Sequence, residues 1–177
     1  MATVPTPRTW TIGEVLSAAK MNAELRDALA FLLAPPMAIL RKTANQLLPN
    51  GIHQTLTYET EDLDRDGGHS TTTNNTRYVA QTAGWHSLGA AAVFAANGSG
   101  WRDVMFQKNA TSATRQNRAV VAAIPGGAAQ VAVAISGHMY LNVSDFVEVA
   151  VYQNSGGGLN VLPSDQDSRF EIRWVST

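Results

Sequence analysis

Three aspartates stand at alternate positions before a glycine, and this spacing is the clearest chemical pattern in the sequence. Asp62, Asp64 and Asp66, followed by Gly67, match the start of a D-x-D-x-D-G calcium loop, in which hard oxygen ligands surround Ca²⁺. The twelfth position of such a loop is Thr73 instead of a bidentate glutamate, and no helical pattern flanks it. A solvated acidic turn between strands is therefore the preferred interpretation, with a calcium site as the alternative.

The histidines and possible nucleophiles form no catalytic pattern. None of the four histidines has a second one at the H-x-x-x-H spacing of metal ligands; they are His53, His69, His86 and His138. The sequence also lacks G-x-S-x-G, H-E-x-x-H and G-x-x-x-x-G-K, which mark serine hydrolases, zinc peptidases and phosphate-binding loops. Without cysteine there is no thiolate nucleophile and no disulfide. We therefore expect no enzymatic activity and no cofactor.

Aromatic side chains offer a different chemistry, because flat rings stack on the apolar faces of sugars. Trp85 and Trp101 are the candidates for such a surface, with Tyr140, Tyr152 and Trp174 as further aromatic residues. Most aromatic residues of a β-sandwich instead fill its core or an interface. Two coplanar rings on the outer surface would favour a carbohydrate-binding module, whereas rings that face the interior would not.

The composition excludes several classes of function. The 177 residues include 13 Lys and Arg against 14 Asp and Glu, so nucleic-acid binding is not expected. No stretch approaches about 18 consecutive apolar residues, so membrane insertion is not expected either. The charged fraction of 15% is below the roughly 25% of ordinary soluble domains. Such a surface suits contact with copies of itself or with other subunits, although the composition of a GC-rich genome would explain it equally well.

An N-terminal helix is predicted from Thr11 to Ala34. Thr11-Ile12-Gly13-Glu14 matches a capping box, and Pro35-Pro36 stops the helix. Its apolar seam has spacings of three and four, like a coiled coil in which one core asparagine sets the register. The seam residues are Val15, Ala18, Asn22, Leu25, Leu29 and Leu32. An ordinary amphipathic helix on its own domain is the alternative. A helix of this length needs a surface to lie on, which we expect sister chains or a larger scaffold to provide.

Residues 37–177 follow the alternation typical of β-strands. In Arg169–Trp174 apolar and charged side chains alternate throughout, so one face is expected to be buried. Turn residues separate about ten predicted strands, at 38–42, 53–58, 77–81, 85–95, 101–108, 118–124, 129–135, 138–142, 147–151 and 169–174. No helical pattern lies between them. The prediction is a mainly β protein, an antiparallel β-sandwich of the jelly-roll type preceded by a short N-terminal α-helix.

Two connections receive specific predictions. Trp85–Lys108 is expected to form one long hairpin with its tip at 97–100, and Ser155–Gly158 is expected to be a hairpin loop. The first hairpin is rich in small residues, namely Ala90, Ala91, Ala92, Ala95 and Ala96. Small side chains suit the close approach of another surface. The alternative is a tightly packed sheet face in which alanine opposes large residues such as Phe94 or Trp101.

Several short motifs occur in an order that resembles a known family. The motifs are Thr43–Gly51, Glu61–His69, Asn74–Arg77, Thr82–His86, Ala95–Arg102 and Leu141–Val149. Together they resemble the jelly roll shared by complement globular heads and tumour necrosis factors, and in particular its bacteriophage versions. The leader from Pro7 to Val15, continuing through Asn22, Arg26–Ala28 and Phe31–Pro36, is similar to the N-terminal segment of virion proteins in phages of actinobacteria. Those proteins are called minor tail proteins or head fibres.

This resemblance implies a homotrimer whose three jelly rolls pack around an axis and serve adhesion or decoration. It implies two parts: an extended arm and helix in residues 1–36, which dock on other virion proteins, and a projecting head in residues 37–177. Because about 36 residues precede the head, no long fibre shaft is expected. The implied location is the virion, on its tail or capsid, assembled in the cytoplasm of the bacterial host. The alternative is a receptor- or carbohydrate-binding module at the tail tip, with a host cell-surface glycan as partner.

Overall fold

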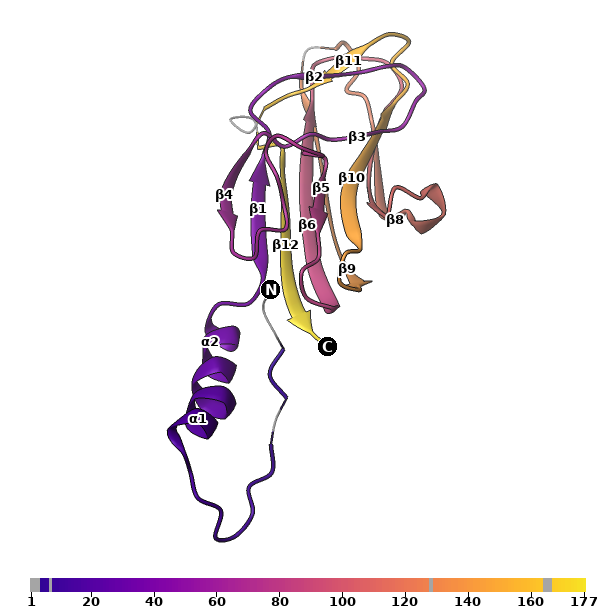
Figure 1. Ribbon diagram of the computed structural model, residues 1–177. Coiled ribbons are helices and arrows are strands. Elements are labelled where there is room, and N and C mark those ends of the chain that lie inside the picture. The colour runs from indigo at the N-terminus through magenta and orange to yellow at the C-terminus, as the bar shows by residue number, and fades with distance from the viewer. Residues whose placement is uncertain (1–3, 7, 128, 164–166) are drawn as a thin grey trace.

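Alternating apolar residues build two antiparallel sheets in the computed structural model (Figure 1). The structure describes residues 4–6, 8–127, 129–163 and 167–177, so Pro7 of the leader motif lies outside it. The strands within these ranges are β1 (Met37–Arg41), β2 (Gln46–Leu48), β3 (Gln54–Thr55), β4 (Thr60–Asp64), β5 (Arg77–Val79), β6 (Gly84–Phe94), β7 (Trp101–Lys108), β8 (Gln116–Ala122), β9 (Val131–Leu141), β10 (Phe146–Gln153), β11 (Leu159–Val161) and β12 (Arg169–Ser176).

The strands are divided between a seven-stranded and a five-stranded sheet. The seven-stranded sheet has the order β2-β11-β6-β12-β1-β4, and β9 also pairs with β6. The five-stranded sheet has the order β3-β10-β7-β8, and β5 also pairs with β10. The longest ladder joins β6 and β9, from Gly84 opposite Leu141 to Phe94 opposite Val131. This architecture confirms the predicted fold class, an antiparallel jelly roll after a short N-terminal helix.

Apolar side chains from both sheets fill the space between them. In β12, Phe170, Ile172 and Trp174 are buried, and the charged residues that alternate with them face outward. Phe106 of the five-stranded sheet approaches Phe170 from the opposite side, with ring centroids 6.1 Å apart. The period of two along each strand therefore sends one face into the core, as the sequence pattern of β12 predicts.

The long hairpin predicted for Trp85–Lys108 is wrong. Its two strands, β6 and β7, belong to different sheets, so the loop at 95–100 crosses the top of the sandwich. The guanidinium of Arg102, which is fully buried, donates hydrogen bonds of 2.9 and 3.1 Å to two carbonyl groups of this loop. The Ser155–Gly158 connection is not a hairpin loop either, because it joins β10 to β11 in the other sheet.

Short strands account for most of the other differences. The predicted set lacks β2, β4 and β11, and the segment expected to be an acidic turn from Glu61 begins inside β4. Each of these strands is paired with a neighbour distant in sequence, β4 with β1 and β11 with β2 and β6. Two predicted strands, 129–135 and 138–142, are the single strand β9, because Ser136 and Gly137 stay paired with β6.

A continuous helical segment precedes β1. It consists of α1 (Ala18–Met21), a π-helical turn (Asn22–Arg26) and α2 (Asp27–Leu33). Figure 1 shows it beyond the end of the sandwich where β1 begins and β12 ends. Among the described residues, no helix is long and apolar enough to cross a membrane.

The helix begins later than the capping-box prediction from Thr11. Ser17 is the N-cap, and its Oγ accepts a hydrogen bond of 3.3 Å from the backbone N–H of Lys20. Thr11–Glu14 forms a separate turn, because Gly13 has a φ of +81°, which lies outside the right-handed helical region. Val15, the first residue of the predicted seam, therefore lies outside the helix.

Candidate functional site

The outward side of β6 and β9 carries mostly small side chains. Gly89 is paired with Ser136, and Ala91 with Ala134. Together with Ala132, these residues are named here the small-residue face. The three β9 residues are exposed, while the two β6 residues are half-buried. Because these side chains rise little above the sheet, another surface can approach the backbone closely.

The two interpretations of the alanine run apply to different residues. Ala90 and Ala92 point inward and belong to the same buried cluster as Phe94. Ala91 points outward, because neighbouring residues of a strand face opposite sides. Ala90 and Ala92 therefore pack in the core, and Ala91 between them lies on the small-residue face.

Two exposed aromatic rings lie at one end of the small-residue face. Trp85 and Tyr140 are partners in the β6–β9 ladder, and their ring centroids are 5.8 Å apart at an interplanar angle of 80°. Both rings remain exposed. Aromatic residues are enriched at protein interfaces, so these rings extend the contact area that the small-residue face offers.

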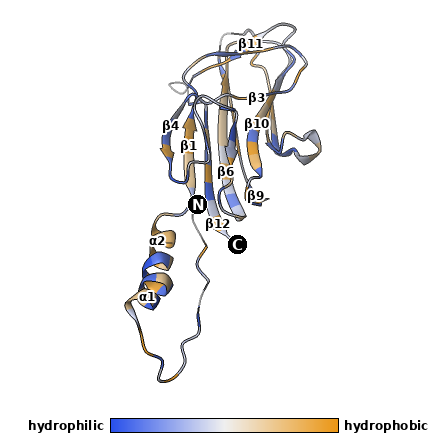
Figure 2. Ribbon diagram, in the orientation of Figure 1, coloured by the Kyte–Doolittle hydropathy of each residue, from blue (hydrophilic) through white to orange (hydrophobic). Residues whose placement is uncertain are grey.

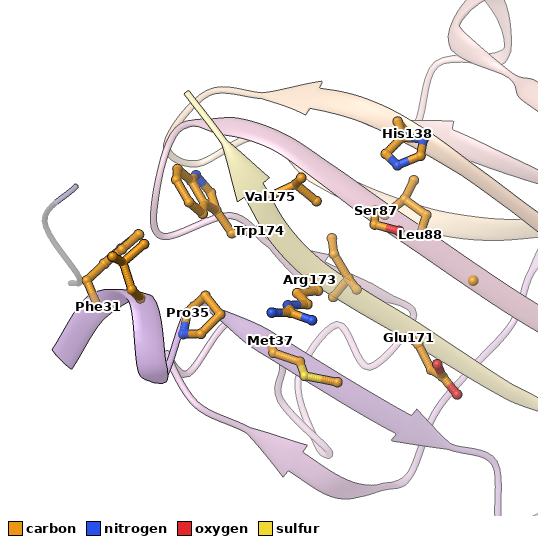
Figure 3. Close-up of a pocket in the computed structure, with 13 residues that line it drawn as sticks. Phe31, Pro35, Met37, Ser87, Leu88, His138, Glu171, Arg173, Trp174 and Val175 are labelled. Carbon is orange, nitrogen blue, oxygen red and sulfur yellow. The ribbon is translucent and has the colours of Figure 1, made fainter. Parts of the chain in front are cut away.

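A groove of about 580 Å³ lies between β12, its neighbouring strands and the helix (Figure 3). Phe31 and Pro35 stand at its helical end, and Ser87 and His138 line its other end. Arg173 projects from β12 between them. The groove joins the end of α2 to the small-residue face, so helix and face form one continuous surface.

The helix contacts the sandwich through a residue outside the predicted seam. Phe31 is buried, and its ring meets that of Trp174 with centroids 4.8 Å apart. The seam residues Leu25, Leu29 and Leu32 are 44%, 57% and 67% exposed. In Figure 2 the helix, which carries both hydrophobic and hydrophilic residues, stands clear of the two sheets. The remaining seam residues within the helix, Ala18 and Asn22, are also exposed.

The sequence pattern could not distinguish Phe31 from the seam. Phe31 neighbours Leu32 in an apolar run, and both fit an amphipathic helix. Its role depends on Pro35 and Pro36, after which β1 begins. The chain turns there, and the last helical turn is brought against the end of β12.

Each of the three aspartates of the acidic segment has a partner within the protein. Asp62 pairs with Arg41 across the neighbouring strand. The Asp64 carboxylate accepts hydrogen bonds of 2.9 to 3.2 Å from three backbone amides of the following turn. The Asp66 carboxylate accepts a hydrogen bond of 2.7 Å from the Tyr78 hydroxyl. Burial raises the pKa of Asp66. Among the described residues, no group of three histidine or acidic side chains is placed to hold a metal ion.

The four histidines lie in separate places. The ring nitrogens of His69 lie 2.8 and 3.1 Å from two backbone carbonyl oxygens. His86 is fully buried, and burial lowers its pKa. His138 lines the groove. The ring of His53 lies 4.8 Å from that of Tyr152, measured between centroids.

The structure does not bring the two candidate tryptophans together. Trp85 is the second residue of β6 and Trp101 is the first residue of β7, so they lie on different sheets and at opposite ends of the sandwich. Each has its own aromatic neighbour. Trp101 stacks on Tyr152 with centroids 6.3 Å apart and an interplanar angle of 27°. Trp85 and Trp101 therefore do not share one binding surface, although both are exposed, and Trp101 and Tyr152 form a nearly parallel pair.

Comparison with known proteins identifies the fold. No family model and no curated protein matches the sequence. The crystal structure of murine APRIL at pH 8.5 matches with a TM-score of 0.57 and 11% identity, over 78% of this chain and 99% of that chain. The globular domain of zebrafish complement 1qA matches with a TM-score of 0.54 and 12% identity, over 79% and 97%. The chain thus has the jelly roll of tumour necrosis factors and complement heads, as the motif order predicts.

Proposed function

We propose that this chain is a non-enzymatic structural protein of a phage particle, whose β head forms a homotrimer and projects from the particle. The observation that carries the proposal is the small-residue face on the seven-stranded sheet. Its three β9 residues are exposed, and the exposed rings of Trp85 and Tyr140 border it. In this fold the sequence resemblance implies three heads around one axis, and a face of small residues lets neighbouring heads approach closely.

Charges beside this face favour a specific arrangement of the copies. Arg169, Glu171 and Arg173 face outward from β12, and the Arg169 Nε lies 3.0 Å from a Glu171 carboxylate oxygen. Contacts in a three-fold ring join two different patches, one from each neighbour. The alternating charges would therefore fix the register of one head against the next, while the small residues allow close packing.

The leader supports attachment to the particle. Its sequence is similar to the N-terminal segments of actinobacterial phage virion proteins, and its exposed leucines lie beyond the end of the sandwich. Exposed apolar side chains on a short helix favour docking on another surface. We therefore infer that residues 1–36 dock on a capsid or tail protein while the head points away. Assembly would take place in the bacterial cytoplasm, before release of the virion.

Light scattering of the purified chain tests the trimer. We expect a mass of three times 18.9 kDa. Ala134→Glu places a carboxylate on the small-residue face and should give monomers with unchanged circular dichroism. Val120→Glu is the control, because Val120 is an exposed strand residue of the other sheet, and it should remain trimeric. A monomeric wild type at micromolar concentration would contradict the trimer, and equal behaviour of both variants would contradict the small-residue face as its interface.

A particle map tests the location. The chain should be found in purified virions by mass spectrometry, and a low-resolution reconstruction should show three β heads outside the capsid or tail. Particles that lack the protein would contradict the virion role while leaving the trimer intact.

A further inference from the structure

A row of aromatic rings crosses the outward side of the five-stranded sheet. Tyr152 lies in the middle, with His53 on one side and Trp101 on the other. The centroid distances are 4.8 and 6.3 Å, and the interplanar angles are 39° and 27°. Trp101 and His53 are exposed, and Tyr152 is half-buried. The row therefore places three exposed or half-buried rings on three adjacent segments.

A pocket of about 430 Å³ opens beside this row, within the roughly 300–1,000 Å³ range of small-molecule sites. His53 and Thr55 line one side, and Gln107 and Arg115 line another. Ala150 lies between them, and its small side chain leaves the space open. The pocket is thus bounded by aromatic, amide, hydroxyl and guanidinium groups.

Several of these polar groups are free to bind a ligand. In the described part of the chain, the side chains of His53, Gln54 and Thr55 make no hydrogen bond, although all three line the pocket. Within the described ranges, the Arg115 guanidinium forms a hydrogen bond only through its Nε, which donates to Gln107 at 2.9 Å. Its two terminal nitrogens remain available. The pocket therefore offers both donors and acceptors.

A layer of buried polar residues holds these groups in place. The Gln107 amide donates a hydrogen bond of 3.3 Å to Glu148, and Glu148 accepts another of 2.8 Å from the Thr76 hydroxyl. Gln107 and Glu148 are buried. This chain of hydrogen bonds fixes the side chain on which Arg115 rests, so the free end of Arg115 is oriented before a ligand arrives.

A buried carboxylate lies beside the aromatic row. Asp103 is the partner of Tyr152 in the β7–β10 ladder and is fully buried. One of its carboxylate oxygens accepts a hydrogen bond of 2.6 Å from Arg118. The other has no hydrogen-bond partner among the described residues. Arg118 pairs with Asp103, and Arg115 is linked to Glu148 through Gln107, so two positive groups accompany two carboxylates. The surroundings are therefore close to neutral and rich in hydrogen-bonding groups.

We propose that this pocket and the adjacent Tyr152–Trp101 pair bind a neutral saccharide. A pyranose ring has an apolar face that stacks on aromatic rings. Its hydroxyl groups both donate and accept, which matches an amide, an imidazole, a hydroxyl and a guanidinium. The balanced charges give no reason to prefer an anion. Exposure of this sheet in the particle rests on the proposed trimer, which uses the other sheet.

In the test, the full-length chain is titrated with glucose, galactose, mannose and N-acetylglucosamine. Saturation-transfer NMR measures the binding of each sugar. At least one sugar should bind saturably. Trp101→Ala and Arg115→Ala should each weaken that binding by about tenfold, because they remove the stacking surface and the free donors. Trp10→Ala is the control, because Trp10 is 38% exposed against 42% for Trp101 but lies in the leader.

The outcomes separate this proposal from the trimer. Circular dichroism and light scattering on the same samples report folding and mass. A trimer that binds no sugar of the panel overturns the saccharide site alone, and so does equal binding by the Trp101→Ala protein. A monomer that binds sugar overturns the trimer alone. Binding of inorganic phosphate in preference to every sugar would overturn the assignment of a neutral ligand.

Discussion

The ring of Phe31 meets the ring of Trp174 nearly edge-on, with centroids 4.8 Å apart and an interplanar angle of 83°. The Trp174 indole N–H donates to the carbonyl of Ala83 at 2.9 Å, and its backbone N–H donates to the carbonyl of Pro36 at 2.9 Å. One tryptophan thus joins the helix, the start of the first strand and the last strand. This contact ties the leader to the head.

Phe31→Ala should release the helix from the head. Aromatic pairs contribute about 0.5–1.5 kcal/mol beyond their buried area, so we expect an unfolding free energy lower by about 1 kcal/mol or more. Limited proteolysis should cut the leader faster than in the wild type. Leu33→Ala is the control, because Leu33 is 82% exposed and its removal should change neither measurement. Equal cleavage rates in both variants would mean that Phe31 does not hold the helix.

Deletion of residues 1–36 should leave a folded head that remains trimeric but does not join particles. Most strands from β1 onward contribute to one buried apolar cluster, whereas the helix exposes most of its leucines. Circular dichroism, light scattering and the protein content of purified particles measure these three outcomes. Normal incorporation of the truncated chain would place the anchor in the jelly roll. Failure to fold would make the helix part of the core.

Leu25→Asp combined with Leu29→Asp should reproduce the loss of incorporation in the full-length chain. Both leucines are exposed in the free protein, so folding should be unaffected, whereas a carboxylate buried without a partner at the docked surface costs several kcal/mol. Ala19→Asp with Ala23→Asp adds the same charge to exposed positions off the seam and should leave incorporation normal. Equal loss in both double variants would indicate a charge effect without a specific seam.

Chelation should leave the thermal midpoint unchanged. The Asp64 carboxylate already accepts three backbone amides, and Asp62 and Asp66 have side-chain partners. A native Ca²⁺ site would instead raise the midpoint with increasing calcium, because a ligand that binds only the folded state stabilises it by mass action. A calcium-dependent rise of several degrees, absent in an Asp66→Asn variant, would establish the site and contradict our interpretation.

Stability should fall as the pH drops below 6.5. Burial lowers the pKa of His86 from its ordinary value of 6.5, so the unfolded chain binds more protons than the folded one in this range. The contribution of neutral His86 to the free energy of unfolding is therefore fully present above pH 6.5. It is lost progressively as the pH falls below this value. Denaturant unfolding at pH 8, 6.5 and 5.5 measures the slope.

His86→Gln should reduce this slope without abolishing it, because partial desolvation of its ring and the nearby charge of Arg115 also lower the pKa of His53. A flat profile in the wild type between pH 8 and 5.5 would contradict the prediction.

The sequence by itself determined the features that depend on local pattern. The alternation in Arg169–Trp174 predicted the buried side of β12, and the predicted bounds 101–108 are those of β7. The order of motifs identified the jelly roll, which the structural comparisons confirm. These features follow from side-chain periodicity and turn residues, which act between near neighbours along the chain.

Tertiary structure decided the features that depend on partners distant in sequence. Three-residue strands such as β2 and β11 exist because each completes a ladder with the other, and a pattern that short has no period to recognise. The strands β6 and β7 belong to two different sheets. The loop at 95–100 connects them, and the buried Arg102 side chain donates hydrogen bonds to this loop. That separation parts Trp85 from Trp101. Trp101 instead meets Tyr152, whose ring also contacts His53, because strand pairing brings together residues that no spacing in the sequence relates.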